Sequence, residues 1–323
     1  MEQHSYGKKI AAVLLFISLI SGNFLPSSRP SDCSGLIERA GVALNMTGPA
    51  EHIFRGGSLT MLANSAGRQM LSMILEADDG TLVVIDGGWS MDAYHLTQVL
   101  KERGGHVSAW FLTHPHNDHV GAFIDIVNDP ESPITIDHVY YALADQSWYD
   151  ENESFRSDTV TELRNALSKF PAERLHNNTP RGQQIAIGGI TAQFMNNIYL
   201  LDETPVNNSS MVVKFTMDGL SILVLGDLGA SGGRMLLAEN GAEALKSDIV
   251  QMAHHGQSGV EKDIYTAICP SICLWPTPKW LWNNDEGNGK GSGNWYTLDT
   301  RAWMDELGVK AHYGLMDGDW VIY

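Results

Sequence analysis

Apolar and polar residues alternate along the chain first with the period of strands and then with that of helices. Two β-rich runs, residues 71–77 and 81–86, flank a short polar turn and predict a hairpin. Residues 96–100 carry apolar side chains at helical spacing, and residues 107–112 form the next β-rich run. An apolar run over residues 120–127 predicts a short helix. The histidine-rich sequence between the last two elements is therefore predicted to form a strand-to-helix loop.

The second half of the chain continues this alternation. Its predicted elements are a helix over residues 160–170, strand signals over 185–194, a hairpin over 211–225, a short strand over 249–253, a helix over 300–307 and a last hairpin through 317–318 to the C-terminus. Hairpins mix with crossover connections, which is typical of mixed sheets covered by helices.

The N-terminus has the pattern of a leader. Lys8 and Lys9 precede an apolar run of about a dozen residues, which is too short to span a bilayer comfortably. We expect a signal peptide or an N-terminal anchor over residues 1–22, a linker rich in proline and serine over 23–50, and a folded domain over 51–323. The protein is expected to be secreted or extracytoplasmic, with membrane contact only through an uncleaved leader.

The charge of the chain narrows the classes of partner. With 21 basic and 38 acidic residues, its formal net charge is −17 at pH 7. Tight binding to nucleic acid depends on Lys and Arg neutralising phosphates, so such a surface disfavours a nucleic-acid partner.

One short stretch carries a dense set of metal-ligand side chains. His114, His116, Asp118 and His119 place three imidazoles and one carboxylate within six residues, a density that packing alone does not produce. His114 and His116 would hold one metal ion, and Asp118 and His119 would hold a second.

Two further ligand groups follow predicted strands directly. Asp227 comes after the strand that ends near residue 225, and His254-His255 come after the strand over 249–253. Two ions about 3.5–4 Å apart need a shared carboxylate, for which Asp227 is the candidate. One of the two histidines would complete the set. Imidazole combined with carboxylate suits zinc, manganese or iron.

The motif Thr-His-Pro-His-Asn-Asp-His-Val-Gly at residues 113–121 resembles the signature loop of the metallo-β-lactamase fold superfamily. Asp86 matches the preceding acidic motif of that family, Asp227 its bridging aspartate and His254-His255 its last histidine motif. Taken together with Asn207-Asn208-Ser-Ser-Met-Val-Val, these motifs are similar to the soluble hydrolase domain of ComEC-type competence proteins and to secreted choline-phosphate esterases.

The resemblance extends from about residue 55 to the C-terminus and implies a fold and a set of roles. The implied fold is an α/β (α+β) four-layer αββα sandwich of two mixed sheets with outer helices, with two divalent ions, zinc first among them, at one edge between the sheets. The roles are His255 as a metal ligand, His254 as a donor to the developing oxyanion or leaving group, Asp86 as a partner that fixes a ligand histidine, and Asn207, Asn208 and Lys279 as candidate substrate contacts.

This chain departs from the family at one metal ligand. Many relatives have a further histidine between the first cluster and the aspartate, whereas this chain has Asn207-Asn208-Ser209 there. We therefore expect one metal to be held more weakly, and a β-lactam substrate is disfavoured. The tryptophan-rich segment 275–296 predicts no regular element, and either an anchored surface loop or a substrate-facing lid fits it.

These observations together predict a metal-dependent hydrolase. A metal-bound water loses its proton near neutral pH, so hydroxide is available as the nucleophile, and Asp118 and Asp227 would hold and orient it. The expected substrate is a phosphodiester or related ester, in a small molecule or a cell-surface polymer, outside the cytoplasm. The alternatives are a ComEC-like nuclease, a lactone or carboxyl-ester hydrolase, and a non-catalytic metal-binding recognition module.

Overall fold

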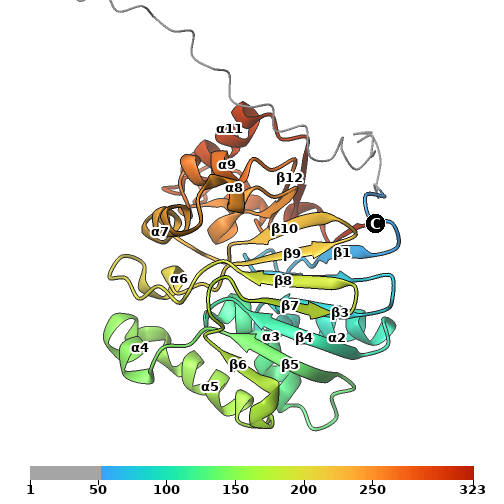
Figure 1. Ribbon diagram of the computed structural model, residues 1–323. Coiled ribbons are helices and arrows are strands. Elements are labelled where there is room, and N and C mark those ends of the chain that lie inside the picture. The colour runs from blue at the N-terminus through green and yellow to red at the C-terminus, as the bar shows by residue number, and fades with distance from the viewer. Residues whose placement is uncertain (1–51) are drawn as a thin grey trace, which may run out of the picture. The chain divides into compact units, whose positions relative to one another are not determined.

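The computed structural model describes residues 52–323 (Figure 1). The predicted leader over residues 1–22 and the predicted linker over residues 23–50 lie outside the described residues. Within residues 52–323, no helix combines the length and the apolar character that crossing a bilayer requires.

The first sheet is mixed. Its strands, in spatial order, are β14 (Trp320–Ile322), β1 (Ser58–Met61), β2 (Ser72–Glu76), β3 (Leu82–Asp86), β4 (His106–Leu112), β5 (Thr135–Tyr141) and β6 (Leu175–Asn177). Neighbours pair antiparallel from β14 to β3 and parallel from β3 to β6. The parallel half brings the end of β3 beside the end of β4.

The second sheet repeats this plan. Its order is β13 (Ala311–Gly314), β12 (Ile272–Trp275), β11 (Ile249–Gln251), β10 (Leu220–Val224), β9 (Val213–Met217), β8 (Ile190–Phe194) and β7 (Gln184–Ile187). Strands β13 to β10 pair parallel, and β10 to β7 pair antiparallel. Parallel pairing places the ends of β10 and β11 at one edge of the sheet.

Helices cover the outer faces of the two sheets (Figure 1). On the side of the first sheet are α2 (Ala93–Glu102), α3 (Asn117–Asn128), α4 (Gln146–Asn152) and α5 (Ser157–Leu167). On the side of the second are α7 (Ala230–Asn240), α8 (Ala242–Leu245), α9 (Lys262–Ile268), α10 (Lys279–Trp282) and α11 (Thr297–Leu307), and a short α6 (Pro205–Asn208) lies at the left of the figure with α4 and α7. The predicted four-layer αββα sandwich is confirmed.

Aromatic side chains join the two sheets in the middle layer. Phe111 on β4 stacks on Tyr140 of β5, with ring centroids 4.8 Å apart. It also meets Phe215 of the second sheet edge-on, at 5.0 Å. Phe111 and Phe215 are fully buried, and aromatic pairs of this kind add about 0.5–1.5 kcal/mol beyond the area that they bury. The inner faces of the sheets thus form one continuous core that fixes the spacing of the strand ends.

Two predicted hairpins are confirmed and one is wrong. β2 pairs with β3, and β9 pairs with β10 through Asp218-Gly219, both of which have positive φ, as a tight hairpin turn requires. The predicted C-terminal hairpin does not form. β13 pairs with β12, whereas β14 crosses to the other sheet and pairs with β1. Local turn chemistry could not show this, because each strand finds a better partner far away in the sequence.

Gly226 allows the chain to turn sharply between β10 and Asp227. Its φ is +57°, and a Cβ atom there would lie 2.9 Å from Ser210 Oγ and 3.0 Å from the Thr113 Cβ. Gly219 has a φ of +82° but open space around it. The two positions therefore share backbone strain and differ in packing.

We expect Gly226→Ala to lower the free energy of unfolding by roughly 2–5 kcal/mol, because left-handed backbone strain and overpacking add together. Gly219→Ala, which introduces the strain alone, should lower it by about 1–2 kcal/mol. Urea unfolding of both variants measures the difference. Equal losses would show that close packing around Gly226 contributes nothing.

Candidate metal centre

The first ligand cluster spans the end of a loop and the start of a helix. His114 and His116 follow β4, and α3 begins at Asn117 with His116 as its extended N-cap residue. The amides of His119 and Val120 both donate to the His116 carbonyl, at 3.0 Å. Asp118 and His119 therefore lie in the first turn of α3, not in the loop where the hydrophobic pattern placed them. A regular helix fixes their side chains more rigidly than a loop could.

The second ligand group comes from two turns of the other sheet. Asp227 follows β10, and His254 and His255 lie in the turn η4 (Ala253–Gly256) after β11. Both histidines have left-handed backbones, with φ of 50° and 56°, which is rare for non-glycine residues and is concentrated at functional sites. The His254 amide donates to the Gly226 carbonyl at 3.1 Å. This bond ties the two turns together.

The Asp227 carboxylate lies at the centre of the cluster. Its Oδ1 is 3.2 Å from His119 Nε2, and its Oδ2 is 3.4 Å from His255 Nε2. The same Oδ2 is 3.7 Å from His114 Nε2. The predicted bridging aspartate is therefore within reach of ligands from both halves of the cluster.

Two more contacts complete the arrangement. His114 Nε2 lies 3.0 Å from His116 Nδ1, and His255 Nε2 lies 3.2 Å from Asp118 Oδ2. Two sets of three residues have ligand atoms within 4.8 Å of one another, and both sets are buried. One set is His114, His119 and Asp227; the other is Asp118, His119 and His255.

The buried polar atoms of the cluster fit a divalent cation. His119 Nε2, His255 Nε2 and Asp227 Oδ1 are buried and have no hydrogen-bond partner among the described residues, although they lie about 3 Å from one another's carboxylate or imidazole groups. Buried polar atoms normally have partners. Atoms that are close but not aligned for hydrogen bonding face a common point, as metal ligands do.

The buried carboxylates of the cluster also stabilise positive charge close to them. Burial acts to lower the pKa of His119, but the carboxylates of Asp227 and Asp86 outweigh it and hold that pKa well above its ordinary value. Burial likewise opposes protonation of His255, and Asp227 and Asp118 still raise its pKa to about 9. The buried carboxylates therefore stabilise the protonated forms of these two imidazoles. A divalent cation would take the place of those protons.

Each ligand histidine is oriented through its other ring nitrogen. Asp86 Oδ2 lies 2.6 Å from His119 Nδ1, and both Asp86 oxygens accept hydrogen bonds from Thr113. Thr113 Oγ1 also lies 3.2 Å from His114 Nδ1, and the Pro276 carbonyl lies 3.1 Å from His255 Nδ1. These contacts leave the Nε2 atoms free to face the centre. The structure places Asp86 where the family resemblance implied.

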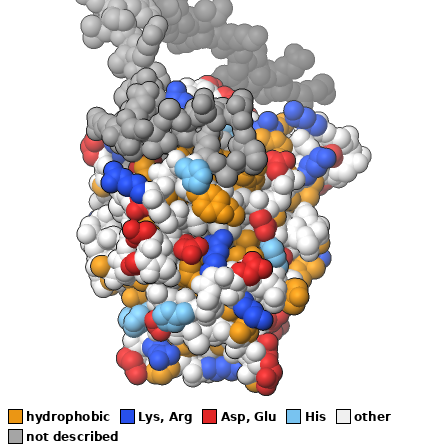
Figure 2. All heavy atoms as spheres, turned by 90° about the vertical axis from the view of Figure 1, so that its right-hand side faces the viewer, with side chains coloured by type: hydrophobic (Ala, Val, Ile, Leu, Met, Phe, Trp, Pro, Cys, Tyr) orange, Lys and Arg blue, Asp and Glu red, His pale blue; other side chains and the backbone are white. Residues whose placement is uncertain are grey.

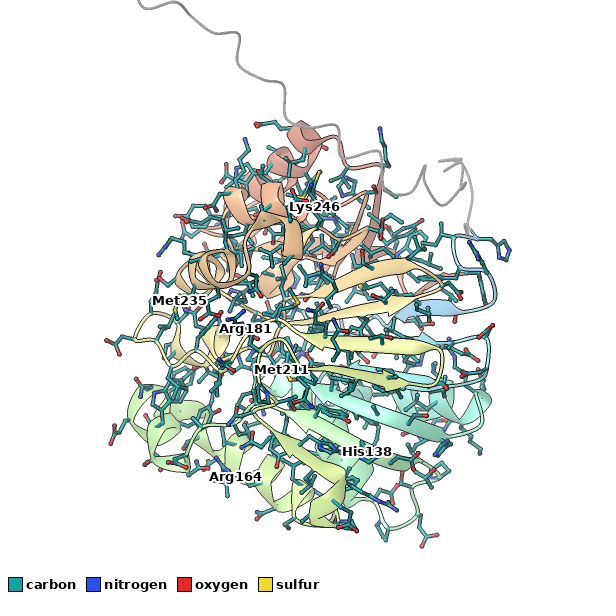
Figure 3. All side chains as sticks on the ribbon, viewed as in Figure 1. His138, Arg164, Arg181, Met211, Met235 and Lys246 are labelled. Atoms are coloured by element: carbon teal, nitrogen blue, oxygen red, sulfur yellow. The ribbon has the colours of Figure 1, made fainter. Side chains whose placement is uncertain are left out.

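The sequence did not reveal the partner of His116. Glu153 holds its carboxylate 3.2 Å from His116 Nε2, and its side chain is only 13% exposed. This contact leaves His116 Nδ1, the atom facing His114, for a metal. Glu153 follows α4, whose start is tied to α5 by Arg164, labelled in Figure 3, which donates to the Ala144 carbonyl and the Gln146 side chain.

The candidate substrate contacts fall in different places. Asn207 Nδ2 lies 3.3 Å from His254 Nε2, beside the cluster. Asn208 is fully buried. Its Nδ2 donates to the Glu203 carbonyl and to Thr204 Oγ1, and its Oδ1 accepts from the Gly229 amide. The prediction that Asn208 contacts substrate is therefore corrected, because this side chain holds the surrounding turn together.

Lys279 and the tryptophan-rich segment lie to one side of the cluster. Lys279 is exposed at the start of α10 and lines a separate cavity. Trp275 is buried, and the Arg301 guanidinium lies 3.9 Å from the ring centre of Trp282. Two of the tryptophans thus anchor the segment to the domain, while Trp280 and Trp295 stay partly exposed and pack edge-on at 5.0 Å.

We expect Glu153→Ala to weaken binding of one metal ion by about 10–100-fold, because His116 loses the partner that orients it. Glu153→Gln should restore part of this affinity, since its amide oxygen can still accept the ring N–H. Competition with a chelating dye measures both, and the exposed neighbour variant Glu151→Ala serves as the control. Unchanged affinity in Glu153→Ala would remove this residue from the site.

A family model covers the residues of this cluster. The family model described as the metallo-beta-lactamase superfamily matches residues 67–268. No curated protein matches the chain.

Similar solved structures include the metallo-beta-lactamase fold protein YhfI from Bacillus subtilis, which is 11% identical, with an alignment covering 82% of this chain and 99% of that one at a TM-score of 0.49. Unliganded yeast PDE1 is 14% identical, with coverage of 83% and 99% and a TM-score of 0.49. A diphosphatase from the PhnP family is 15% identical, with coverage of 72% and 93% and a TM-score of 0.40. The family match spans more than half of the 323 residues and includes every ligand of the cluster. The chain belongs to the metallo-β-lactamase superfamily.

Proposed function

We propose that this protein is a metal-dependent hydrolase that cleaves a phosphodiester or a related ester outside the cytoplasm. The observation that carries the proposal is the Asp227 carboxylate, which lies within 3.7 Å of imidazoles from both halves of a buried ligand cluster. A shared carboxylate between two ligand sets is the arrangement that two-metal hydrolytic sites require.

The ligand atoms divide into two sets. His114 Nε2, His116 Nδ1 and Asp227 would hold the first ion, and Asp118, His119 and His255 would hold the second with Asp227 shared. Imidazole and carboxylate ligands suit zinc, and manganese or iron would also fit. With Asp227 counted in both, the first set has three ligands and the second has four, which supports weaker binding of the first ion.

The chemistry follows from this arrangement. Two divalent ions, when bound, supply a hydroxide nucleophile near neutral pH and polarise the oxygen of the group under attack. Asp118 from α3 and Asp227 after β10 would orient the reacting centre. Gln69 Nε2 donates to Asp118 Oδ2 at 3.3 Å. Burial of both carboxylates keeps bulk water away from them, which strengthens their electrostatic effect.

The role of His254 follows from its tautomer. Its Nδ1 lies 3.2 Å from the Ser258 carbonyl, which can only accept, so this nitrogen carries the ring proton. Its Nε2 therefore carries the lone pair, which faces Asn207 Nδ2 at 3.3 Å and lies 3.9 Å from Asp227 Oδ2. A neutral imidazole in this state is a better metal ligand than proton donor. We propose that His254 completes the first set in place of the histidine that this chain lacks.

Substrate class and location rest on the sequence. The leader pattern supports a site of action outside the cytoplasm, and the absence of the additional family histidine from the sequence disfavours a β-lactam. On the face shown in Figure 2, Lys and Arg are interspersed with Asp and Glu, and the described residues form no continuous basic stripe there. The net charge of −17 argues against a nuclease, although the resemblance to competence proteins favours one.

We expect metal-loaded protein to contain about two ions per chain and to hydrolyse bis-p-nitrophenyl phosphate, with turnover lost on chelation. Asp227→Ala should lower turnover by more than about 100-fold, since loss of an outer contact to a ligand already costs 10–100-fold. Asp202→Ala, at an exposed position, is the control.

Other outcomes would assign a different function. Tightly bound metal without phosphodiesterase activity would move the search to lactones and carboxyl esters. Ligand binding that survives metal removal would identify a recognition module. A folded protein that binds no metal under any condition would exclude a metal-dependent hydrolase.

We expect His254→Ala to lower the metal content from about two ions toward one, because the first set loses its third imidazole. A proton-donor role predicts a different result: full metal content, with turnover falling much more for an alkyl ester than for a p-nitrophenyl ester, whose leaving group needs no proton. Elemental analysis and the two substrates separate the roles.

A further inference from the structure

A hollow adjoins the loop whose Gln69 side chain donates to Asp118 of the metal centre. This cavity of about 480 Å³ is bounded by the loop before β2, the start of α10 and the turn before β14. Arg68 and Lys279 line it together with His95 and Asp319. Arg68 directly precedes Gln69, whose side chain donates to Asp118 of the metal centre. Consecutive Cα atoms lie about 3.8 Å apart. Arg68 of the cavity is therefore the direct neighbour of the residue that contacts the ligand Asp118.

The loop that presents Arg68 is held on several sides. The Asn64 side chain accepts from the Arg68 amide at 3.2 Å and donates to Asp92 at 2.8 Å. The Trp89 indole donates to the Gln69 carbonyl at 2.7 Å, and the Trp280 indole, next to Lys279, donates to the Gly67 carbonyl at 3.1 Å. The backbone positions of Arg68 and Lys279 are thus fixed relative to each other and to Asp118.

The carboxylates nearest the two cations of the cavity already have other partners. Among residues 52–323, neither Arg68 nor Lys279 forms an ion pair, and the Arg68 guanidinium lies 5.4 Å from the ring centre of Trp89. Asp319 is already engaged by His95 Nε2 and the Ala63 amide, both at 2.7 Å. The Asp92 carboxylate, which interacts electrostatically with Arg68, is held by the Asn64 side chain and the Trp89 amide. An anion could therefore bind Arg68 and Lys279 without displacing an ion pair.

We propose that this cavity binds an anionic group of the substrate, a phosphate or carboxylate that lies beyond the scissile ester. Guanidinium and ammonium groups are the groups that proteins use to hold such anions, and Arg68 and Lys279 both line this cavity. The inference rests on the proposed function and narrows its substrate class to esters that carry a second negative charge. It gives Lys279 a role distinct from contact with the reacting group.

Paired substrates test this subsite. The p-nitrophenyl ester of thymidine 5′-phosphate is compared with the same ester carrying an additional 3′-phosphate. We expect kcat/KM to favour the 3′-phosphorylated ester, and this preference to fall about tenfold in Arg68→Gln/Lys279→Gln, the size of one charge-assisted hydrogen bond. The matched control is Arg55→Gln/Lys310→Gln, at exposed positions elsewhere. An unchanged preference in the cavity variant would overturn the substrate assignment.

Binding of inorganic phosphate to the metal-loaded protein, measured by calorimetry, tests the cavity without turnover. We expect a phosphate site that Arg68→Gln/Lys279→Gln abolishes and Asp227→Ala retains. If neither ester is hydrolysed, the proposed function fails while this result would still support an anion site. Phosphate binding at the cavity with no effect on ester preference would assign it to free phosphate and contradict the substrate role. Absence of both effects would overturn the proposal entirely.

Discussion

The arrangement of the metal centre depends on one electrostatic constraint, the burial of several carboxylates in a small volume. Asp86, Asp118 and Asp227 are each at most 5% exposed, and a buried charge is stable only when opposite charge lies close to it. Burial acts to raise the pKa of Asp227, but His255 and His119 hold it well below its ordinary value. The two sheets must therefore bring imidazoles and carboxylates together at one edge, and the strand ends do this. The order of the strands and the chemistry of the centre are consequences of the same requirement.

Hydrogen-bond partners on the outer side of the ligand histidines fix the orientation of their rings. Each ligand histidine has a partner at its outer ring nitrogen. His119 contacts Asp86, His114 contacts Thr113, His116 contacts Glu153, and His255 contacts the Pro276 carbonyl. When the outer N–H of a neutral imidazole donates a hydrogen bond to such a partner, the other ring nitrogen faces the centre with its lone pair. The left-handed backbones of His254 and His255 serve the same end, since they bring two consecutive side chains to the centre from one short turn. Such strain persists only where the surrounding structure holds it, here through the bond from the His254 amide to Gly226.

Local patterns in the sequence predicted much of this structure, and the remainder depends on contacts between distant residues. Strand periodicity located β2, β3, β9 and β10, and the spacing of His114, His116, Asp118 and His119 identified the centre because ligand density is a local property. Glu153 carried no such signal, since nothing near it in the sequence distinguishes it from Glu151. Asn208 had a plausible motif but a buried side chain, and burial is decided by packing. The crossing of β14 to the first sheet likewise depends on β1, which lies more than 250 residues earlier.

The net negative charge of the chain and the individual charges near the metal centre act on an anion at different distances. A net charge of −17 repels anions at long range, but salt limits that repulsion to roughly 8–10 Å. At shorter distances individual charges dominate, and under the proposed function an anionic ester would meet the metal-loaded centre and the side chains of Arg68 and Lys279, which form no ion pair among the described residues. Arg68 and Gln69 are consecutive, so the loop that aligns Asp118 also presents a cation to the substrate side. Under that proposal, an acidic protein with a few accessible cations would favour a ligand whose negative charges are few and closely spaced over a long polyanion that must also lie along the surface. Net charge alone therefore argues against nucleic acid without arguing against phosphate esters.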